Sequence, residues 1–353
     1  MGTGEPPVPT VIDVPHVSPR RRPHVSGQAA LAGAIGVTVV VLVALGRRFG
    51  YGPVDYLQLL VDGLRTGVIY ALVALGFVVV HRVTGVINFA QGAFVMLGPM
   101  ITISLFGMPW LPAPGQRLLL SAALAVLITA AVGMAVHRAA LHPVRAASLL
   151  TRIIITVGIY IVIQGIALII WGPRPYVLPA FSTLQMADRT FLVGEVIIQA
   201  QTIWIWATAA ATVGLMGLFF ERTVAGKAMR ACAVNRTAAQ LMGIRVDTMA
   251  TLAFGLAAVL GAIGGIVLGP VTRPTFDMGL ELGLKGFVAA IMGGLVSFQG
   301  AAIGGLVLGV LETLWAGVTL AGFKDLFAFV VLILLLLIRP QGFLAAREEA
   351  ESP

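Results

Sequence analysis

Residues 57–80, LQLLVDGLRTGVIYALVALGFVVV, and residues 89–106, FAQGAFVMLGPMITISLF, are two long apolar runs separated by a short connection. A helix needs about 20 apolar residues to cross the hydrocarbon core of a membrane. The apolar side chains in both runs are continuous and do not alternate with polar ones, which excludes the strands of a β-barrel. The two runs therefore predict neighbouring membrane-spanning helices.

The composition extends this prediction to the whole chain. Of the 353 residues, 58% are hydrophobic and 11% are charged, whereas a soluble domain has about 25% charged residues. So few charged side chains cannot cover the surface of an ordinary soluble enzyme. The net charge of +8 comes from scattered Lys and Arg residues. These residues do not form the basic patch that is typical of a nucleic-acid-binding protein. The single cysteine, Cys232, excludes a disulfide framework and a cysteine-based metal site.

The predicted fold is an all-α polytopic membrane helix bundle. It has about ten hydrophobic segments, some of them broken or re-entrant, within a transmembrane domain at residues 28–345. The candidate spans are 28–46, 57–80, 89–106, 118–136, 152–171, 202–220, 249–269, 281–296, 300–318 and 324–339.

The two ends of the chain are expected to be cytoplasmic. Residues 1–27 are rich in proline and predict a disordered tail, and residues 346–353 form a short second tail. Residues 28–46 are either a retained helix or a signal peptide; their length and the Gly46-Arg47-Arg48 ending favour the helix. With both tails inside, the inner connections carry about twice as many Lys and Arg residues as the outer ones, as the positive-inside rule predicts.

Several ionisable side chains fall within the apolar spans, where charges are costly and often functional. Glu281 and Lys285 are four residues apart, and Asp62 and Arg65 are three apart, so each pair can form an ion pair on one helical face. Glu312 has no partner at helical spacing. Proton coupling and a hydrogen bond within the bundle are both open for it.

Two polar interruptions predict a substrate pathway. Asn88 and Gln91 lie between glycines in the sequence INFAQG at 87–92, where a helix can break. Irregular backbone at membrane depth is tolerated only where it is buried in protein or lines water. We therefore expect Asn88 and Gln91, and Ser297 and Gln299 at a second interruption, to line the pathway. Hydrogen bonding between helices is the alternative for all four.

The inner connection at 221–248 is the most polar stretch after the N-terminal tail. Residues 226–242 can form a short helix, and Gly243 is a suitable C-terminal cap because glycine tolerates a left-handed backbone. Such a helix either transmits force from a cytosolic motor or rests on anionic headgroups. These physical considerations leave both alternatives open.

Motifs spread over residues 57–345 resemble the inner-membrane permeases of branched-chain amino acid ABC importers, the hydrophobic amino acid uptake importers. Within the inner connection, the matching residues are Gly226, Arg230, Ala231, Asn235, Ala238, Leu241 and Gly243. Elsewhere, the matching stretches are GVIYAL (67–72), GVINFAQG (85–92), GLKGF (283–287), AAIMGG (289–294) and RPQGFL (339–344).

The resemblance implies a multi-pass permease subunit in the cytoplasmic membrane of a prokaryote, carrying leucine, isoleucine, valine or related small amino acids and amides. The implied partners are a second permease subunit, two cytosolic ATP-binding subunits docking at 226–244, an extracytoplasmic substrate-binding protein and membrane lipid. Charge reversal at Arg230 or Arg236 is then expected to uncouple transport. An ABC permease for urea or a sugar, and a proton-coupled secondary transporter using Glu312, remain alternatives.

No catalytic motif accompanies these features. The H-E-x-x-H, nucleophile-elbow and paired-carboxylate patterns are absent, and Gly226-Lys227 lacks the other residues of a phosphate-binding loop. The glycine-rich runs at 261–265 and 300–309 lie inside apolar spans, where they predict close helix packing. The sequence therefore predicts a transport subunit that is not an enzyme and has no cofactor or metal site.

Overall fold

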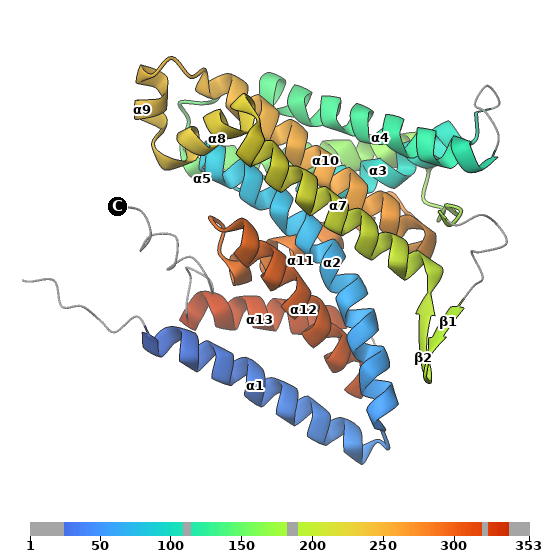
Figure 1. The fold of residues 1–353 in the computed structure, drawn as a ribbon. Helices are drawn as coiled ribbons and strands as arrows, with labels where there is room; N and C mark the ends of the chain where they lie inside the picture. Colours follow the sequence, from blue (N-terminus) through green and yellow to red (C-terminus); the bar gives the residue numbers. More distant parts are fainter. Residues whose placement is uncertain (1–24, 109–113, 182–189, 320–323, 339–353) are drawn as a thin grey trace, which may run out of the picture.

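The computed structural model describes residues 25–108, 114–181, 190–319 and 324–338, and shows a helical bundle with one short hairpin (Figure 1). The helices are α1 (Val25–Arg48), α2 (Pro53–Thr84), α3 (Gln91–Phe106), α4 (Pro114–Val136), α5 (Leu149–Trp171), α7 (Ala200–Arg222), α8 (Val224–Val234), α9 (Arg236–Leu241), α10 (Val246–Thr272), α11 (Met278–Gly293), α12 (Phe298–Val318) and α13 (Lys324–Ile338). A π-helical turn, His137–Leu141, follows α4, and the hairpin strands are β1 (Thr190–Val193) and β2 (Val196–Gln199).

Each of the ten predicted spans overlaps one helix, but the count of ten membrane crossings is not confirmed. Among the described residues, six helices are long and apolar enough to cross a membrane: 53–84, 117–141, 149–171, 200–222, 246–272 and 298–318. By contrast, α3 and α11 have 16 residues each. At 1.5 Å per residue they reach about 24 Å, less than the hydrocarbon thickness of about 30 Å.

The predicted tails fall almost entirely outside the described residues. α1 begins at Val25, which places residues 25–27 in a helix and not in the N-terminal tail. The all-α membrane bundle includes one short β element, because the connection between α5 and α7 forms the antiparallel hairpin β1–β2. Thr190 pairs with Gln199 and Val193 with Val196, and Gly194 adopts a φ of 68° in the turn.

Two helices occupy the centre of the bundle. The most apolar windows of α2 and α10 are 78% buried, whereas those of α4, α5 and α7 are 22%, 17% and 22% buried. A helix that is apolar on all sides is stable only inside a protein or against lipid. The outer helices are therefore suited to a lipid environment or to a partner subunit in the membrane.

Small residues bring the central helices into backbone contact. A Cβ on Gly309 of α12 would lie 2.3 Å from the Cα of Gly67 on α2. A Cβ on Gly265 of α10 would lie 1.9 Å from the carbonyl oxygen of Val95 on α3. Small side chains allow such close approaches between membrane helices. The predicted close packing at both glycine-rich runs is confirmed.

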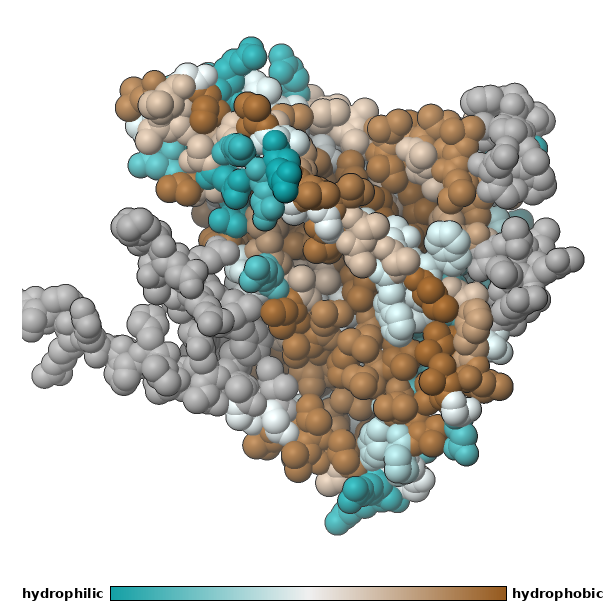
Figure 2. Space-filling view, in the orientation of Figure 1, coloured by the Kyte–Doolittle hydropathy of each residue, from teal (hydrophilic) through white to brown (hydrophobic). Residues whose placement is uncertain are grey.

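The surface has the polarity of a membrane protein. Figure 2 shows a broad hydrophobic surface between hydrophilic groups near α8 and α9 and others at the opposite end of the bundle. The apolar side chains exposed on α5 include Ile154, Ile161 and Ile169. An apolar surface of this extent favours burial in lipid or against another subunit.

Candidate functional site

The connection between α2 and α3 is a buried turn. α2 is capped by Gly85, which has a φ of 69° and donates its N–H to the carbonyl of His81. Asn88 is fully buried, and its Oδ1 accepts the N–H of Ala90 at 3.1 Å. Its Nδ2 has no hydrogen-bond partner among the described residues. The predicted interruption of the helix is confirmed, and it leaves one amide donor unsatisfied in the interior.

Gln91 connects three helices at the start of α3. Its Nε2 donates to the carbonyl of Ala257 on α10 at 2.9 Å, and its Oε1 has no partner among the described residues. A Cβ on Gly76 of α2 would lie 2.1 Å from this Nε2, so the absence of a side chain there makes room for the amide. The contact is a hydrogen bond between helices, and a pathway role for Gln91 stays a prediction.

The second interruption, between α11 and α12, differs in its polar contacts. The Oγ of Ser297 accepts the N–H of Gly300 at 3.1 Å and caps α12. Gln299 is exposed in the structure. The guanidinium carbon of Arg82 lies 5.1 Å above the ring of Phe298, so this interruption lies near the end of α2. The two interruptions therefore share one end of the bundle, and pathway roles for Ser297 and Gln299 stay predictions.

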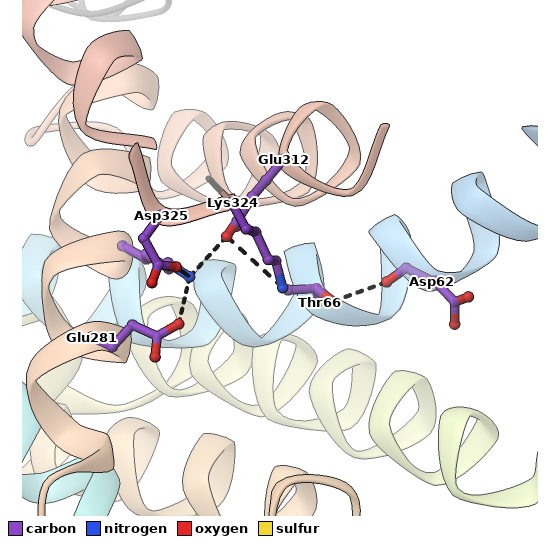
Figure 3. Close-up of polar contacts among 7 residues, drawn as sticks. Asp62, Thr66, Glu281, Glu312, Lys324 and Asp325 are labelled. Atoms are coloured by element: carbon purple, nitrogen blue, oxygen red, sulfur yellow. Dashed lines mark hydrogen bonds and ion pairs between the residues drawn. The ribbon is translucent and has the colours of Figure 1, made fainter. Parts of the chain in front are cut away.

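A charged network joins α11, α12 and α13 (Figure 3). Lys285 on α11 pairs with Glu281 at 2.5 Å, as its helical spacing predicts. Its Nζ also lies 2.8 Å from Glu312 on α12 and 2.6 Å from Asp325 on α13. Lys285 and Glu312 are fully buried, whereas Glu281 and Asp325 are exposed. One lysine therefore forms ion pairs with three carboxylates, which belong to three different helices.

The network provides Glu312, which has no partner at helical spacing, with partners from other helices. Besides Lys285, Lys324 approaches Glu312 at 3.9 Å. The Nζ of Lys285 also lies 5.8 Å from the ring centroid of Tyr70 on α2, a favourable position for a cation. Helical spacing within one helix could not reveal these partners, because they come from other helices.

The hairpin is fixed to α2. Gln58 donates to the carbonyl of Ile197 at 3.2 Å and accepts the N–H of the same residue at 2.9 Å. Asp62 and Arg65 form the predicted ion pair at 3.2 Å, and Arg65 reaches Gln199 at 3.5 Å. Together with Glu195, these side chains line a cavity of about 440 Å³. Nothing in the sequence analysis predicted the strand pairing that places β2 beside this cavity.

The inner connection forms two helices, not the single helix predicted over 226–242. The Oγ1 of Thr223 accepts the N–H of Gly226 at 2.9 Å and caps α8. Asn235 interrupts the helix, and its Oδ1 accepts the N–H of Ala238 at 3.0 Å to cap α9. Asparagine competes for backbone hydrogen bonds in this way and so favours helix starts. Gly243 has a φ of 83°, as the predicted cap requires.

α8 packs against the bundle, whereas the C-terminal end of α9 is exposed. Met229 and Cys232 are buried, and a Cβ on Gly226 would lie 2.2 Å from the carbonyl oxygen of Phe219 on α7. Leu241 and Met242, at the end of α9, are 84% and 83% exposed. The α8–α9 segment therefore combines a packed helix, α8, with exposed apolar side chains at the end of α9.

The arginines of this segment have different environments. Arg230 is exposed on α8, as is Ala238 on α9, while Ala231 packs against the core. The Nη1 of Arg236 donates to the carbonyl of Thr84, the last residue of α2, at 3.1 Å. Charge reversal at Arg236 therefore disturbs the end of α2, and only Arg230 is suitable for a test of docking alone.

Burial raises the pKa of the Cys232 thiol, although the charge of Arg236 opposes the shift. The thiolate is the reactive form, so at neutral pH Cys232 is expected to react slowly with a maleimide in the folded protein and rapidly after unfolding. Mass spectrometry of the labelled chain measures both rates. Val234→Cys in a Cys232→Ser background is the positive control, because Val234 is 86% exposed. Equal rates at the two positions would show that α8 is not packed as described.

Known proteins provide an independent comparison. Residues 59–338 match the family model described as branched-chain amino acid transport system / permease component.

Within the described residues, no group of three His, Cys, Asp or Glu side chains is arranged to hold a metal ion.

Three relatives illustrate the range of similarity. The high-affinity branched-chain amino acid transport system permease protein BraD of Pseudomonas aeruginosa is 34% identical over 304 residues, which cover 83% of this chain and 97% of that protein. The corresponding protein LivH of Escherichia coli is 34% identical over 302 residues, or 83% and 96% of the two chains. A xylose/arabinose import permease of Sulfolobus acidocaldarius is 30% identical over 229 residues, or 62% and 59%.

Proposed function

Because the chain belongs to the family of branched-chain amino acid transport permease components, we propose that it carries leucine, isoleucine, valine or a related small amino acid into the cell. It is the membrane-spanning subunit of an ABC importer and has no ATPase activity of its own. A second permease subunit, two cytosolic ATP-binding subunits and an extracytoplasmic substrate-binding protein complete the transporter.

One observation carries the substrate assignment. The similarity to BraD covers 97% of that relative, so the full permease and not a shared fragment is matched. The sugar permease is the second candidate, but its similarity covers 59% of its length. Uptake of radiolabelled leucine and xylose by the assembled transporter distinguishes the two substrates.

The site for the ATP-binding subunits is the α8–α9 segment. α8 is packed against α7, and the apolar end of α9 is free of contacts that would cover it within the described chain. Movement of the ATP-binding subunits would displace this segment and thereby switch the pathway near Asn88 and Gln91. The segment then lies in the cytoplasm, and both chain termini lie on the same side, as the basic connections indicate.

The charged network argues against a proton-coupled transporter. A proton relay needs a carboxylate that can exchange its proton, whereas Glu312 is buried beside Lys285 at 2.8 Å. We assign the network to holding α11, α12 and α13 together. In proteoliposomes, uptake by the assembled transporter should require ATP and should persist in the presence of an uncoupler.

The docking assignment is tested by removing the exposed apolar side chains of α9. Leu241→Ser together with Met242→Ser is expected to weaken the association with the ATP-binding subunits about thirtyfold, the size of a single interface hot spot. ATP-driven uptake should fall with it, while the melting temperature of the isolated chain stays unchanged. Co-purification from mild detergent, followed by identification of the bound proteins, measures the effect.

Val224→Ser is the matched control, because Val224 is equally apolar and 86% exposed but lies at the start of α8. It should retain the ATP-binding subunits. Normal co-purification and uptake in the Leu241/Met242 variant would place the docking surface elsewhere. Leucine uptake by the chain alone, without ATP, would contradict the ABC importer itself.

A further inference from the structure

A small basic pocket lies at the end of the bundle that carries α8 and α9. Its charged lining is Arg145, Arg152, Arg236 and Asp247, and its volume is about 60 Å³. Arg145 follows the π-helical turn after α4, Arg152 belongs to α5, Arg236 begins α9 and Asp247 lies in the first turn of α10. Four separate segments of the chain therefore place three arginines around one aspartate.

Two of the three arginines already have partners. Arg145 donates to Asp247 at 2.7 Å, and His142 lies 3.6 Å from the same carboxylate. Arg236 donates to the carbonyl of Thr84. The guanidinium of Arg152 has no hydrogen-bond or ion-pair partner among the described residues, and its Nε is buried. The basic pocket thus has an excess of positive charge centred on Arg152.

The position of Arg152 in its helix increases the need for an anion. α5 begins at Leu149 with Ser148 as its cap, so Arg152 lies within one turn of the N-terminus. The helix dipole makes this end positive and disfavours a cation there. The first turn of α5 contains no acidic residue. A bound anion would offset both the dipole and the guanidinium charge.

The surroundings of the pocket indicate which anion binds. Leu149 is exposed on the Arg152 side of α5, at the start of the helix, whereas the exposed Leu150 and Ile154 lie on the opposite, outward side. Basic pockets beside membrane helices bind anionic lipid headgroups. We propose that the basic pocket binds the phosphate of an anionic phospholipid, whose acyl chains lie along α5. The proposal requires a membrane bundle but not the transport function.

The test uses the full chain, delipidated in mild detergent and titrated with phosphatidylglycerol while native mass spectrometry follows binding. Arg152→Gln keeps a similar shape and removes the charge. It should weaken phosphatidylglycerol binding about tenfold, the factor for one charge-assisted hydrogen bond. Arg138→Gln is the matched control, because Arg138 is exposed on the neighbouring turn and does not line the pocket. Melting temperatures of both variants, measured without lipid, check that they are folded.

Three further measurements identify the ligand. Phosphatidylcholine should bind the unaltered chain about tenfold more weakly than phosphatidylglycerol, because its headgroup carries no net charge. Inorganic phosphate should not displace phosphatidylglycerol, and displacement would identify a site for soluble phosphate instead. Unchanged phosphatidylglycerol binding by Arg152→Gln would overturn the proposal. Loss of the ATP-binding subunits from Arg152→Gln, with lipid binding unchanged, would show that the pocket belongs to a protein interface.

Discussion

Lys285→Met is expected to lower the free energy of unfolding by about 3–5 kcal/mol, the cost of leaving one partner of a buried ion pair alone. The abandoned partner is Glu312, which is fully buried and loses a cation at 2.8 Å. Glu281 and Asp325 lose the same cation but are exposed, so solvent compensates them. Thermal unfolding in detergent, followed by circular dichroism, measures the change.

Two further variants separate the buried pair from the rest of the network. Lys324→Met removes a more distant cation, 3.9 Å from Glu312 and 37% exposed, and should have a small effect. Lys285→Met combined with Glu312→Leu replaces the pair by apolar side chains, and should recover most of the lost stability. If Lys285→Met were as stable as Lys324→Met, the network would not hold the three helices together.

Gly309→Leu is expected to destabilise the bundle by about 3 kcal/mol, the upper end of the usual cost of overpacking. Its new Cβ would lie 2.3 Å from the backbone of Gly67, and a backbone atom cannot move aside as a flexible side chain can. α2 and α12 would have to separate. The fraction of monodisperse protein on size-exclusion chromatography in detergent, together with the melting temperature, reports this loss.

The matched control is Gly158→Leu on α5. It adds the same side chain to a membrane helix, but nothing lies within 4 Å of the Cβ position. Its melting temperature should remain close to that of the unaltered chain. Equal losses in the two variants would mean that the effect comes from leucine in a helix and not from the contact between α2 and α12.

The sequence predicted the elements of the fold better than their contacts. Apolar runs such as 57–80 are visible in the sequence because each helix must match the membrane by itself. The Glu281–Lys285 pair was predictable for the same reason, since both residues lie on one helix. The 16-residue helix α11 shows the limit, because an apolar run alone does not tell a full crossing from a shorter segment.

The sequence analysis missed features that depend on contacts between segments far apart in the chain. The pairing of Glu312 with Lys285 depends on how α11 and α12 pack, and β1 and β2 depend on support from Gln58 of α2. The division of the inner connection at Asn235 was different. Its sequence signal was local, because asparagine is a preferred helix start, but it lay inside an otherwise helical pattern.

α2 links the two ends of the bundle mechanically. Its last residue, Thr84, accepts a hydrogen bond from Arg236 of α9, and near its other end Gln58 holds the hairpin. With 32 residues, it forms a rod about 48 Å long. A movement of α9 along the axis of α2 would therefore be transmitted through this continuous helix to the hairpin at the other end of the bundle. Close packing of Gly67 on α2 against Gly309 on α12 restrains bending of α2 near its middle.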